Sequence, residues 1–141
     1  MHEIRYLVTT WEAERPLLQA VRRRVFIVEQ SIPESEEWDE EDLVSVHLLA
    51  TLNCEPVGTG RLSPAGKIGR LAVISELRGH GVGTRLLGLL LGEAARRGML
   101  EVFLHAQVHA VPFYEKAGFQ VQGEVFDEAG IPHLRMRRSL G

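Results

Sequence analysis

Residues 78–84 read RGHGVGT, an arginine followed by three glycines at alternate positions. A strand-like stretch, KIGRLAVI, precedes them, and a leucine-rich stretch with helical spacing follows. The first amide N–H groups of a helix have no partner inside the helix, and the helix dipole adds partial positive charge there. Glycines let an anion approach that backbone closely. The segment therefore predicts a phosphate-binding turn with Arg78 at its entrance; the alternative is a tight strand–helix turn that uses glycine only for its conformation.

The spacing of these glycines argues against two common phosphate-binding motifs. A Walker A loop needs a lysine directly before its serine or threonine, but Gly83 precedes Thr84. The dinucleotide fingerprint needs its third glycine three positions after the second, whereas Gly79, Gly81 and Gly83 are each two apart. A nucleoside triphosphatase and a nicotinamide-dependent enzyme are therefore both disfavoured.

The elements that must position this turn follow from the hydrophobic pattern. We expect strands at residues 2–9, 44–52, 56–63, 67–74 and 101–106, and a hairpin over 119–140 that turns near 127–130. Helices are expected at residues 11–28 with Thr10 as cap, between the glycine turn and Gly98, and at 111–118. Residues 29–42 are acidic and predict a loop or broken helix. About seven strands and four helices in this order predict a mixed α/β sheet.

The composition is that of an ordinary globular protein. Hydrophobic residues make up 45% and charged residues 25% of the 141 residues, so one domain over residues 1–141 can bury a core. The net charge of −3 argues against nucleic-acid binding. Cys54 is the single cysteine, and no signal peptide or apolar stretch of membrane-spanning length is evident, so we expect a cytoplasmic protein. No set of His, Cys and Glu residues has metal-ligand spacing, and no metal is expected.

Two segments of the chain carry a family resemblance. Residues 71–91, LAVISELRGHGVGTRLLGLLL, resemble the acetyl-CoA-binding segment of the GNAT superfamily of N-acetyltransferases, whose Arg-x-x-Gly-x-Gly pattern falls on Arg78, Gly81 and Gly83. Residues 110–119, AVPFYEKAGF, resemble the C-terminal helix of that family. The stretches VRRRVFIVEQ, HLLA and GIPHLRM are similar to the ElaA-like branch. The resemblance implies a mostly antiparallel central sheet flanked by helices.

The resemblance also implies acetyl-CoA as co-substrate and assigns residues to it. The backbone of residues 71–73 pairs with the pantetheine arm like an added strand, and the amides of residues 80–84 hold the diphosphate beside Arg78. Gln107 stands seven residues before Tyr114, where many members have asparagine. The implied coenzyme-binding residues are Leu71, Ala72, Val73, Arg78, Gly79, His80, Gly81, Val82, Gly83, Thr84, Gln107, Ala110, Phe113 and Tyr114.

The implied reaction is direct attack of a neutral amine on the thioester in a ternary complex, without a covalent enzyme intermediate. Tyr114 matches the tyrosine that protonates the leaving thiolate, and the N–H of Val73 is a candidate donor to the oxyanion. Glu29 is the candidate base because a carboxylate ends the apolar run VFIVEQ; the alternatives are an exposed charge at a helix end, a histidine or a water. Cys54 is expected in a turn, which disfavours a cysteine nucleophile.

The acceptor is expected to be a primary amine of a small molecule or a protein. Its candidate contacts are Glu29, Trp38, His47 and His133, each with the alternative of a purely structural role. The acidic run ESEEWDEED, otherwise a solvated loop, would draw cationic amines toward the site. His105 and His109 are expected to pack or cap the end of a strand. A monomer or homodimer is expected, with no nucleic-acid or membrane partner.

Two other function classes remain open from the sequence. The stretch RRRVFIVEQ followed by acidic residues is also similar to acyl-homoserine lactone synthases, which share this fold but have longer chains. A non-catalytic acyl-CoA-binding module is the second alternative, against which the tyrosine at position 114 argues. Thiol release from acetyl-CoA with a panel of amines separates the three.

Overall fold

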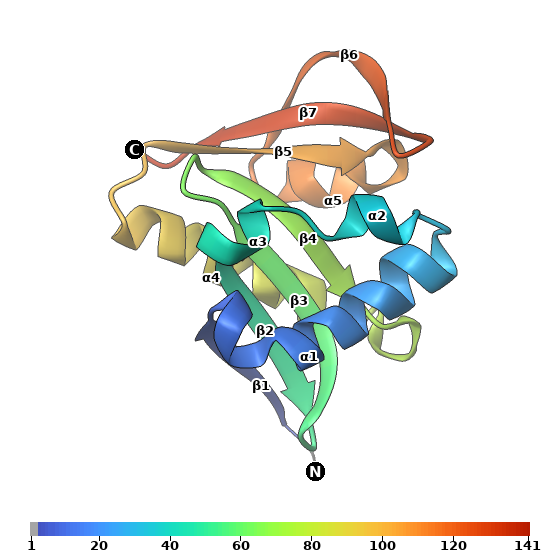
Figure 1. Cartoon of the computed structure of the whole chain (residues 1–141). Helices are drawn as coiled ribbons and strands as arrows, with labels where there is room; N and C mark the ends of the chain where they lie inside the picture. The colour runs from blue at the N-terminus through green and yellow to red at the C-terminus, as the bar shows by residue number, and fades with distance from the viewer. Residues whose placement is uncertain (1–2) are drawn as a thin grey trace.

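The computed structural model describes residues 3–141, which form one seven-stranded sheet in the order β1-β2-β3-β4-β5-β7-β6 (Figure 1). The strands are β1 (Ile4–Thr9), β2 (Val46–Leu52), β3 (Glu55–Leu62), β4 (Lys67–Val73), β5 (Glu101–Gln107), β6 (Gln120–Glu128) and β7 (Ile131–Ser139). Every neighbouring pair is antiparallel except β4 and β5. The predicted mixed, mostly antiparallel sheet is therefore confirmed; the predicted start of the first strand at residue 2 lies outside the described residues.

The helices are α1 (Trp11–Arg22), α2 (Glu34–Glu37), α3 (Glu41–Val44), α4 (Val82–Arg96) and α5 (Val111–Lys116). Short turns of 3-10 helix, η2 (Ser75–Leu77) and η3 (Val108–Ala110), precede α4 and α5. The side chain of Thr10 accepts a hydrogen bond from the amide of Ala13, so the predicted cap is confirmed. The acidic segment is a broken helix, as predicted, and Gly98 with a φ of 80° lies just beyond α4.

The first helix is shorter than its hydrophobic pattern predicts. The α-helix ends at Arg22, and residues Arg23–Glu29 form a π-helical segment, η1, in which the amide of Gln30 donates to the carbonyl of Val25 at 3.1 Å. This wider turn brings Arg22, Val25 and Phe26 all into the interior. The expected helix over residues 11–28 is thus an α-helix only as far as Arg22, whose side chain makes buried ion pairs with Glu37 and Asp42.

The core lies where α4 packs against the middle of the sheet. Leu86, Leu87 and Leu90 of α4 are buried, and α1 crosses the opposite face (Figure 1). Gly60 of β3 lets α4 approach closely, since a Cβ atom at this position would lie 2.7 Å from Cδ1 of Leu90. Interiors are close-packed, so this contact fixes the position of α4 and of the glycine turn at its start.

The parallel pair β4 and β5 separates after only two residue pairs. Lys67 pairs with Phe103 and Ile68 with Leu104, and beyond these pairs the two strands diverge. β4 also contains an irregularity, because Arg70 has a φ of 50° and the register with β3 shifts between Thr59 and Arg61. The hydroxyl of Thr59 donates to the carbonyl of Arg70 at 3.0 Å and holds this bulge. The edge of β4 from residue 69 to 73 is thus left without a neighbouring strand.

None of the helices in residues 3–141 has both the length and the apolar composition needed to cross a membrane. In the same residues, no group of three or more His, Cys, Asp or Glu side chains is placed to hold a metal ion.

Candidate active site

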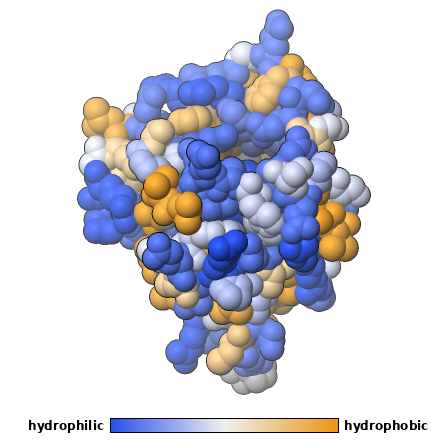
Figure 2. Space-filling model, viewed as in Figure 1, coloured by the Kyte–Doolittle hydropathy of each residue, from blue (hydrophilic) through white to orange (hydrophobic). Residues whose placement is uncertain are grey.

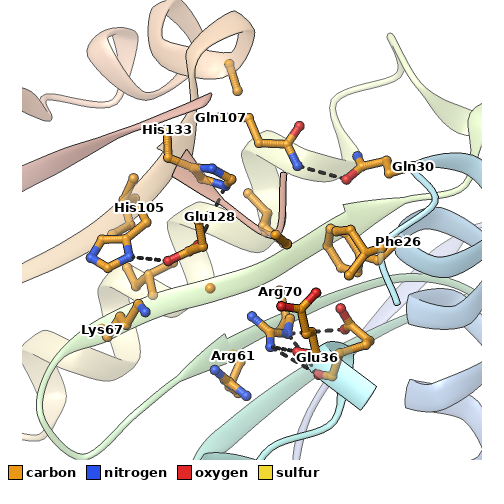
Figure 3. Close-up of a pocket in the computed structure, with 18 of the residues that line it drawn as sticks. Phe26, Gln30, Glu36, Arg61, Lys67, Arg70, His105, Gln107, Glu128 and His133 are labelled. Carbon is orange, nitrogen blue, oxygen red and sulfur yellow. Dashed lines mark hydrogen bonds and ion pairs between the residues drawn. The ribbon is translucent and has the colours of Figure 1, made fainter. Parts of the chain in front are cut away.

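A pocket of about 490 Å³ opens where β4 and β5 diverge (Figure 3). Its walls come from five parts of the chain that are distant in sequence: η1 with the residues after it, the acidic segment, β3–β4, β5 with α5, and the β6–β7 turn. The lining residues include Phe26, Gln30, Glu36, Glu37, Asp39, Arg61, Lys67, Gly69, Arg70, Leu71, Leu104, His105, Gln107, His109, Ala110, Tyr114, Glu128 and His133. Around it the surface is mainly hydrophilic, with hydrophobic residues in separate small patches (Figure 2).

The glycine turn lies at the end of β4, at the N-terminus of α4. Gly79 and Gly81 have φ values of 82° and 81°, which only glycine adopts at no steric cost, and Gly81 is the N-cap of α4. Gly83 has ordinary helical geometry, and a Cβ there would lie 3.7 Å from the ring of Phe113. Two of the three glycines are therefore required by the turn. The amides of Val82, Gly83 and Thr84 form the first turn of α4, where helical N–H groups have no intrahelical partner.

Arg78 is fixed in this turn by two partners. Its Nε donates to the carbonyl of Val73 at 3.0 Å, and its Nη1 and Nη2 donate to the carboxylate of Glu29 at 2.5 and 2.8 Å. The hydrogen bond from Arg78, assisted by the positive charges of Arg78 and Arg24, lowers the pKa of Glu29 despite partial burial. The glycine turn, Arg78 and the end of β4 are thus brought together as predicted from the motif.

The structure does not support Glu29 as the catalytic base. Its carboxylate is held by Arg78 and is not among the groups that line the pocket. A carboxylate with a lowered pKa that already accepts two charged hydrogen bonds is a weak base. The run VFIVEQ is apolar because Val25 and Phe26 are buried in the π-helical turn, and the carboxylate of Glu29 that follows is bound by Arg78 of the glycine turn.

Tyr114 lies on α5 and faces the pocket from the β5 side. Its ring makes edge-on contacts with Phe113 and Phe119, at centroid distances of 5.1 and 5.9 Å. Burial raises the pKa of Tyr114 to about 12, so the phenol keeps its proton at neutral pH. Leu71 and Ala110 line the same pocket, and Phe113 instead covers Gly83. Tyr114 and Leu71, a residue of the free edge of β4, therefore line one pocket.

Gln107 ends β5 and crosses the mouth of the cleft. Its Nε2 donates to Oε1 of Gln30 at 2.8 Å, and Gln30 directly follows the π-helical turn (Figure 3). This contact joins the end of β5 to the residue after η1, although Gln30 and Gln107 are 77 residues apart in sequence. In this structure Gln107 therefore joins the two walls of the site.

Two of the predicted acceptor contacts are structural. His47 is 1% exposed, and its Nε2 donates to the carbonyl of Asp42 at 2.9 Å. Burial lowers the pKa of His47, and its ring packs 5.4 Å from that of Trp11. The guanidinium groups of Arg22 and Arg23 lie 5.1 and 5.7 Å from the centre of the Trp38 ring. Neither His47 nor Trp38 is among the residues that line the pocket, because the apolar strand and the acidic loop turn these side chains elsewhere.

His133 does reach the pocket, together with two residues that the sequence did not single out as site residues. His105 on β5, Glu128 at the end of β6 and His133 on β7 point toward one another (Figure 3). His105 donates through Nδ1 to Oε1 of Glu128 at 2.9 Å, and Nε2 of His133 lies 3.6 Å from Oε2 of the same carboxylate. His109, expected like His105 to pack or cap the end of a strand, also lines the pocket. The available signal was that Glu128 and His133 flank the predicted hairpin turn.

A second group missed from the sequence is a buried ion-pair network beneath the pocket. Arg22 binds Glu37 at 2.7 Å and Asp42 at 2.6 Å, and Arg61 binds Asp42 at 2.9 Å. Arg70, at the β4 bulge, binds Glu37 at 3.1 Å. This network fastens the acidic segment to the sheet, so only part of that segment is a solvated loop. The signal in the sequence was Arg22 itself, four residues after the buried Leu18 on the apolar side of α1.

Comparisons with known proteins agree with this geometry. Residues 14–140 match the model of the acetyltransferase (GNAT) domain. YjcF of Bacillus subtilis, an uncharacterized N-acetyltransferase, is 41% identical over 122 residues, covering 84% of this chain and 87% of that protein. Protein ElaA of Escherichia coli is 36% identical over 133 residues, covering 88% of this chain and 86% of ElaA.

Solved structures give the same result. The crystal structure of Escherichia coli ElaA superimposes with a TM-score of 0.86 at 32% identity, covering 99% of this chain and 100% of ElaA. An acyl-CoA N-acyltransferase from Pseudomonas aeruginosa gives a TM-score of 0.83 at 34% identity, covering 99% and 100% of the two chains. An aminoglycoside 6′-N-acetyltransferase complexed with coenzyme A shares the fold, with a TM-score of 0.72 at 19% identity and 94% and 96% of the chains covered.

The chain belongs to the GNAT family of acyl-CoA N-acyltransferases. Within that family it is similar to ElaA, so the resemblance read from the glycine turn and the Phe-Tyr-Glu-Lys segment is confirmed.

Proposed function

We propose that this protein is an acetyl-CoA-dependent N-acetyltransferase that transfers the acetyl group to a primary amine by direct attack in a ternary complex. One observation carries the proposal: the unpaired edge of β4 is followed, after the short turn η2, by the glycine turn of α4, and Tyr114 lines the same pocket as Leu71 of that edge. The arrangement offers main-chain groups, a helix N-terminus and a proton donor in one continuous cleft.

The register of β3 and β4 supports the coenzyme side of this proposal. Val73 pairs with Gly58, and the next amide, that of Ile74, donates to the carbonyl of Val57 at 3.0 Å. In an antiparallel ladder this pattern makes Val73 and Gly58 a non-hydrogen-bonded pair, so the N–H of Val73 points away from β3, toward the cleft. That N–H is free to bind an extended pantetheine arm or a developing oxyanion.

The glycine turn suits a diphosphate. The backbone conformation at Gly79 and Gly81 leaves no side chain over the first turn of α4, and a Cβ at either position would meet no atom within 4 Å. The amides of Val82, Gly83 and Thr84 supply N–H donors, and Arg78 supplies a full positive charge beside them. The acetyl end of the coenzyme then lies in the direction of Tyr114.

The residues on the β5 side suit proton donation to sulfur. When the carbon–sulfur bond breaks, the thiolate takes the proton of the Tyr114 hydroxyl group, which is present at neutral pH. Acceptors of this reaction are primary amines of small molecules or peptides, and we expect a monomer or homodimer to carry it out.

Thiol release from acetyl-CoA, measured with a panel of primary amines and with no amine, tests this function. Amine-dependent release with formation of the N-acetyl product supports it. Release that requires S-adenosylmethionine indicates an acyl-homoserine lactone synthase. Tight CoA binding without turnover of any amine indicates a non-catalytic acyl-CoA-binding module.

A further inference from the structure

We propose that Glu128 and His133, positioned by His105, form the acceptor-amine site: the Glu128 carboxylate binds the ammonium form of an alkyl amine, and Nε2 of His133 removes its proton. This inference rests on the proposed N-acetyltransferase function and assigns the base and the recognised form of the acceptor.

The hydrogen bonds of His133 fix which ring nitrogen carries the proton. Nδ1 of His133 lies 2.7 Å from the backbone carbonyl oxygen of Ile131, and a carbonyl only accepts, so Nδ1 is the donor. In the neutral ring, Nε2 is then an unprotonated acceptor, and it points toward Glu128 at 3.6 Å. A neutral imidazole with a free lone pair in a pocket is suited to accept a proton.

The carboxylate of Glu128 is suited to hold the ammonium. It is 43% exposed, and in the described part of the chain its one hydrogen bond comes from Nδ1 of His105 at 2.9 Å. A carboxylate has about four acceptor positions, so sites remain for an ammonium group between Oε2 and the lone pair of His133. Burial raises the pKa of Glu128, but the hydrogen bond from His105 and the positive charge of Lys67 outweigh this and lower the pKa, so the carboxylate stays ionised.

The other carboxylates of the pocket are less suited to this role. Glu37 is bound by Arg22 and Arg70, and Asp39 is bound by Arg61 at 2.7 Å and Arg70 at 3.2 Å. Glu36 is exposed at the rim. Only Glu128 combines exposure to the pocket with an imidazole lone pair beside it.

Two aromatic contacts and one strand register hold the cluster in place. The ring of Phe126 stacks on His133 at a centroid distance of 6.0 Å and meets His105 edge-on at 5.0 Å. His133 pairs with Gln107 across β5 and β7, at the point where β5 leads into the turn before Tyr114. The proposed base and the proposed acid are thus placed on adjoining parts of one pocket.

The proton balance of the reaction follows from these positions. The ammonium gives one proton to Nε2 of His133, and the resulting amine forms a bond to the thioester carbon. The carbon–sulfur bond then breaks, sulfur takes the proton of Tyr114, and the nitrogen returns a proton to the phenolate as the amide forms. His133 releases its proton to water, so each turnover liberates one proton.

Nuclear magnetic resonance of histidine-labelled protein tests the geometry without an identified acceptor. Above pH 7, a long-range ¹H–¹⁵N spectrum assigned with His133→Gln should show Nε2 of His133 unprotonated. Addition of n-butylamine, mostly n-butylammonium at this pH, should shift the His133 ring resonances, and Glu128→Gln should abolish that shift. A protonated Nε2, or an unchanged response in Glu128→Gln, overturns the proposal.

Initial rates measured at saturating acetyl-CoA and varied n-butylamine concentration test the roles of Glu128 and His133. Glu128→Gln should raise KM for the amine at least tenfold, and the matched variant Glu124→Gln, an exposed residue of the same strand outside the pocket lining, should not. His133→Gln should lower kcat about 100-fold and remove the loss of activity on acidification, where an imidazole takes up a proton. The other charged or titratable groups that line the pocket are Lys67, Arg61, Arg70, His105, His109, Tyr114, Glu36, Glu37 and Asp39. These groups are unchanged in His133→Gln, so any pH dependence that persists in this variant comes from them.

Calorimetry separates failure of this proposal from failure of the proposed function. All variants should bind CoA like the wild type, because the glycine turn is untouched. If CoA binds and n-butylamine turns over with the same KM in Glu128→Gln as in Glu124→Gln, the acceptor-site proposal is wrong while the acetyltransferase function stands. If the wild type does not bind CoA, the function itself is wrong. Because His133 is buried, its substitution also disturbs packing, so the result with the exposed Glu128 decides between these outcomes.

Discussion

The two sides of the cleft are built differently. The side that we propose for the coenzyme is made of main-chain groups from one stretch of sequence: the edge of β4 and the turn containing Gly79 and Gly81. The acceptor side is made of side chains from η1, the acidic segment, β5 and the β6–β7 hairpin. A site made of backbone is specified locally, whereas a site made of charged side chains depends on every element that carries one. Mutations should therefore affect the two sides separately.

The largest effect is expected in the framework of the acceptor side. Arg22 is 1% exposed and pairs with Glu37 and Asp42, so Arg22→Met leaves two buried carboxylates with fewer partners. Removing one partner of a buried ion pair costs about 3 kcal/mol or more of unfolding free energy. Denaturant unfolding checks this value.

Arg23→Met is the matched control for that experiment, because the Arg23–Glu34 pair is solvent-exposed and its loss should change stability much less. Equal effects of the two substitutions would show that the buried network is not what fastens the acidic segment.

Tyr114, the proposed proton donor that lines the pocket, gives the next test. Tyr114→Phe removes the hydroxyl group and keeps the ring contacts with Phe113 and Phe119, so kcat should fall about 100-fold. CoA affinity measured by calorimetry should stay the same. Wild-type turnover in this variant would remove Tyr114 from the mechanism.

The glycine turn offers a smaller effect confined to the coenzyme side. Gly81→Ala places a side chain on a residue with a φ of 81°, which costs about 1–2 kcal/mol. We expect lower stability and weaker CoA binding, measured by thermal unfolding and calorimetry. Gly92→Ala, within α4 and with open space at its Cβ, should instead stabilise the helix slightly and leave binding unchanged. A Gly81 variant that behaves like the Gly92 variant contradicts the requirement for a left-handed residue.

Substitution of Glu29 tests whether its carboxylate competes with the coenzyme phosphate for the guanidinium group of Arg78. Its carboxylate occupies Arg78, the cation that we assign to the coenzyme phosphate. Glu29→Gln should therefore tighten CoA binding by about two- to fivefold, in line with the modest strength of exposed ion pairs. Weaker binding in titration calorimetry would mean that Glu29 orients Arg78 and does not compete for it.

The smallest effect is expected for His47→Gln, in the pH dependence of the unfolding free energy. It tests whether His47 is a buried structural histidine, unlike His133 in the pocket. Burial lowers its pKa in the folded state, so below a pH of about 6.5, the ordinary value of histidine, the unfolded chain binds more protons. Stability contributed by neutral His47 is present above this pH and is lost as the pH falls. Unfolding measured between pH 7.5 and 5 should show a shallower dependence in His47→Gln. An unchanged slope would contradict a buried neutral His47.

Much of the fold was predictable from the sequence because its signals are local. Thr10 caps α1, Gly98 follows the end of α4, and the hairpin turns at Ala129 and Gly130, as the pattern indicates. The glycine turn was predictable for the same reason: its chemistry depends on consecutive backbone groups.

Apart from His133, which the sequence singled out, the pocket opposite the glycine turn was not predictable because it forms only in three dimensions. Glu128 lies 23 residues from its partner His105, and Arg22 lies 20 residues from Asp42. His47 and His133 both occur in strands with apolar neighbours, yet one is sealed against Trp11 and the other reaches the pocket. The pairing of Glu29 with Arg78 was not predictable either, because Glu29 ends a π-helical turn that the periodicity did not indicate.

Titration calorimetry of the folded wild-type protein with CoA and with pantetheine tests the central claim, that main-chain groups at the start of α4 hold the coenzyme's diphosphate. We predict saturable binding of CoA at one site per chain and much weaker binding of pantetheine, which lacks the diphosphate. Absence of heat with CoA, or equal affinity for the two ligands, would contradict the account.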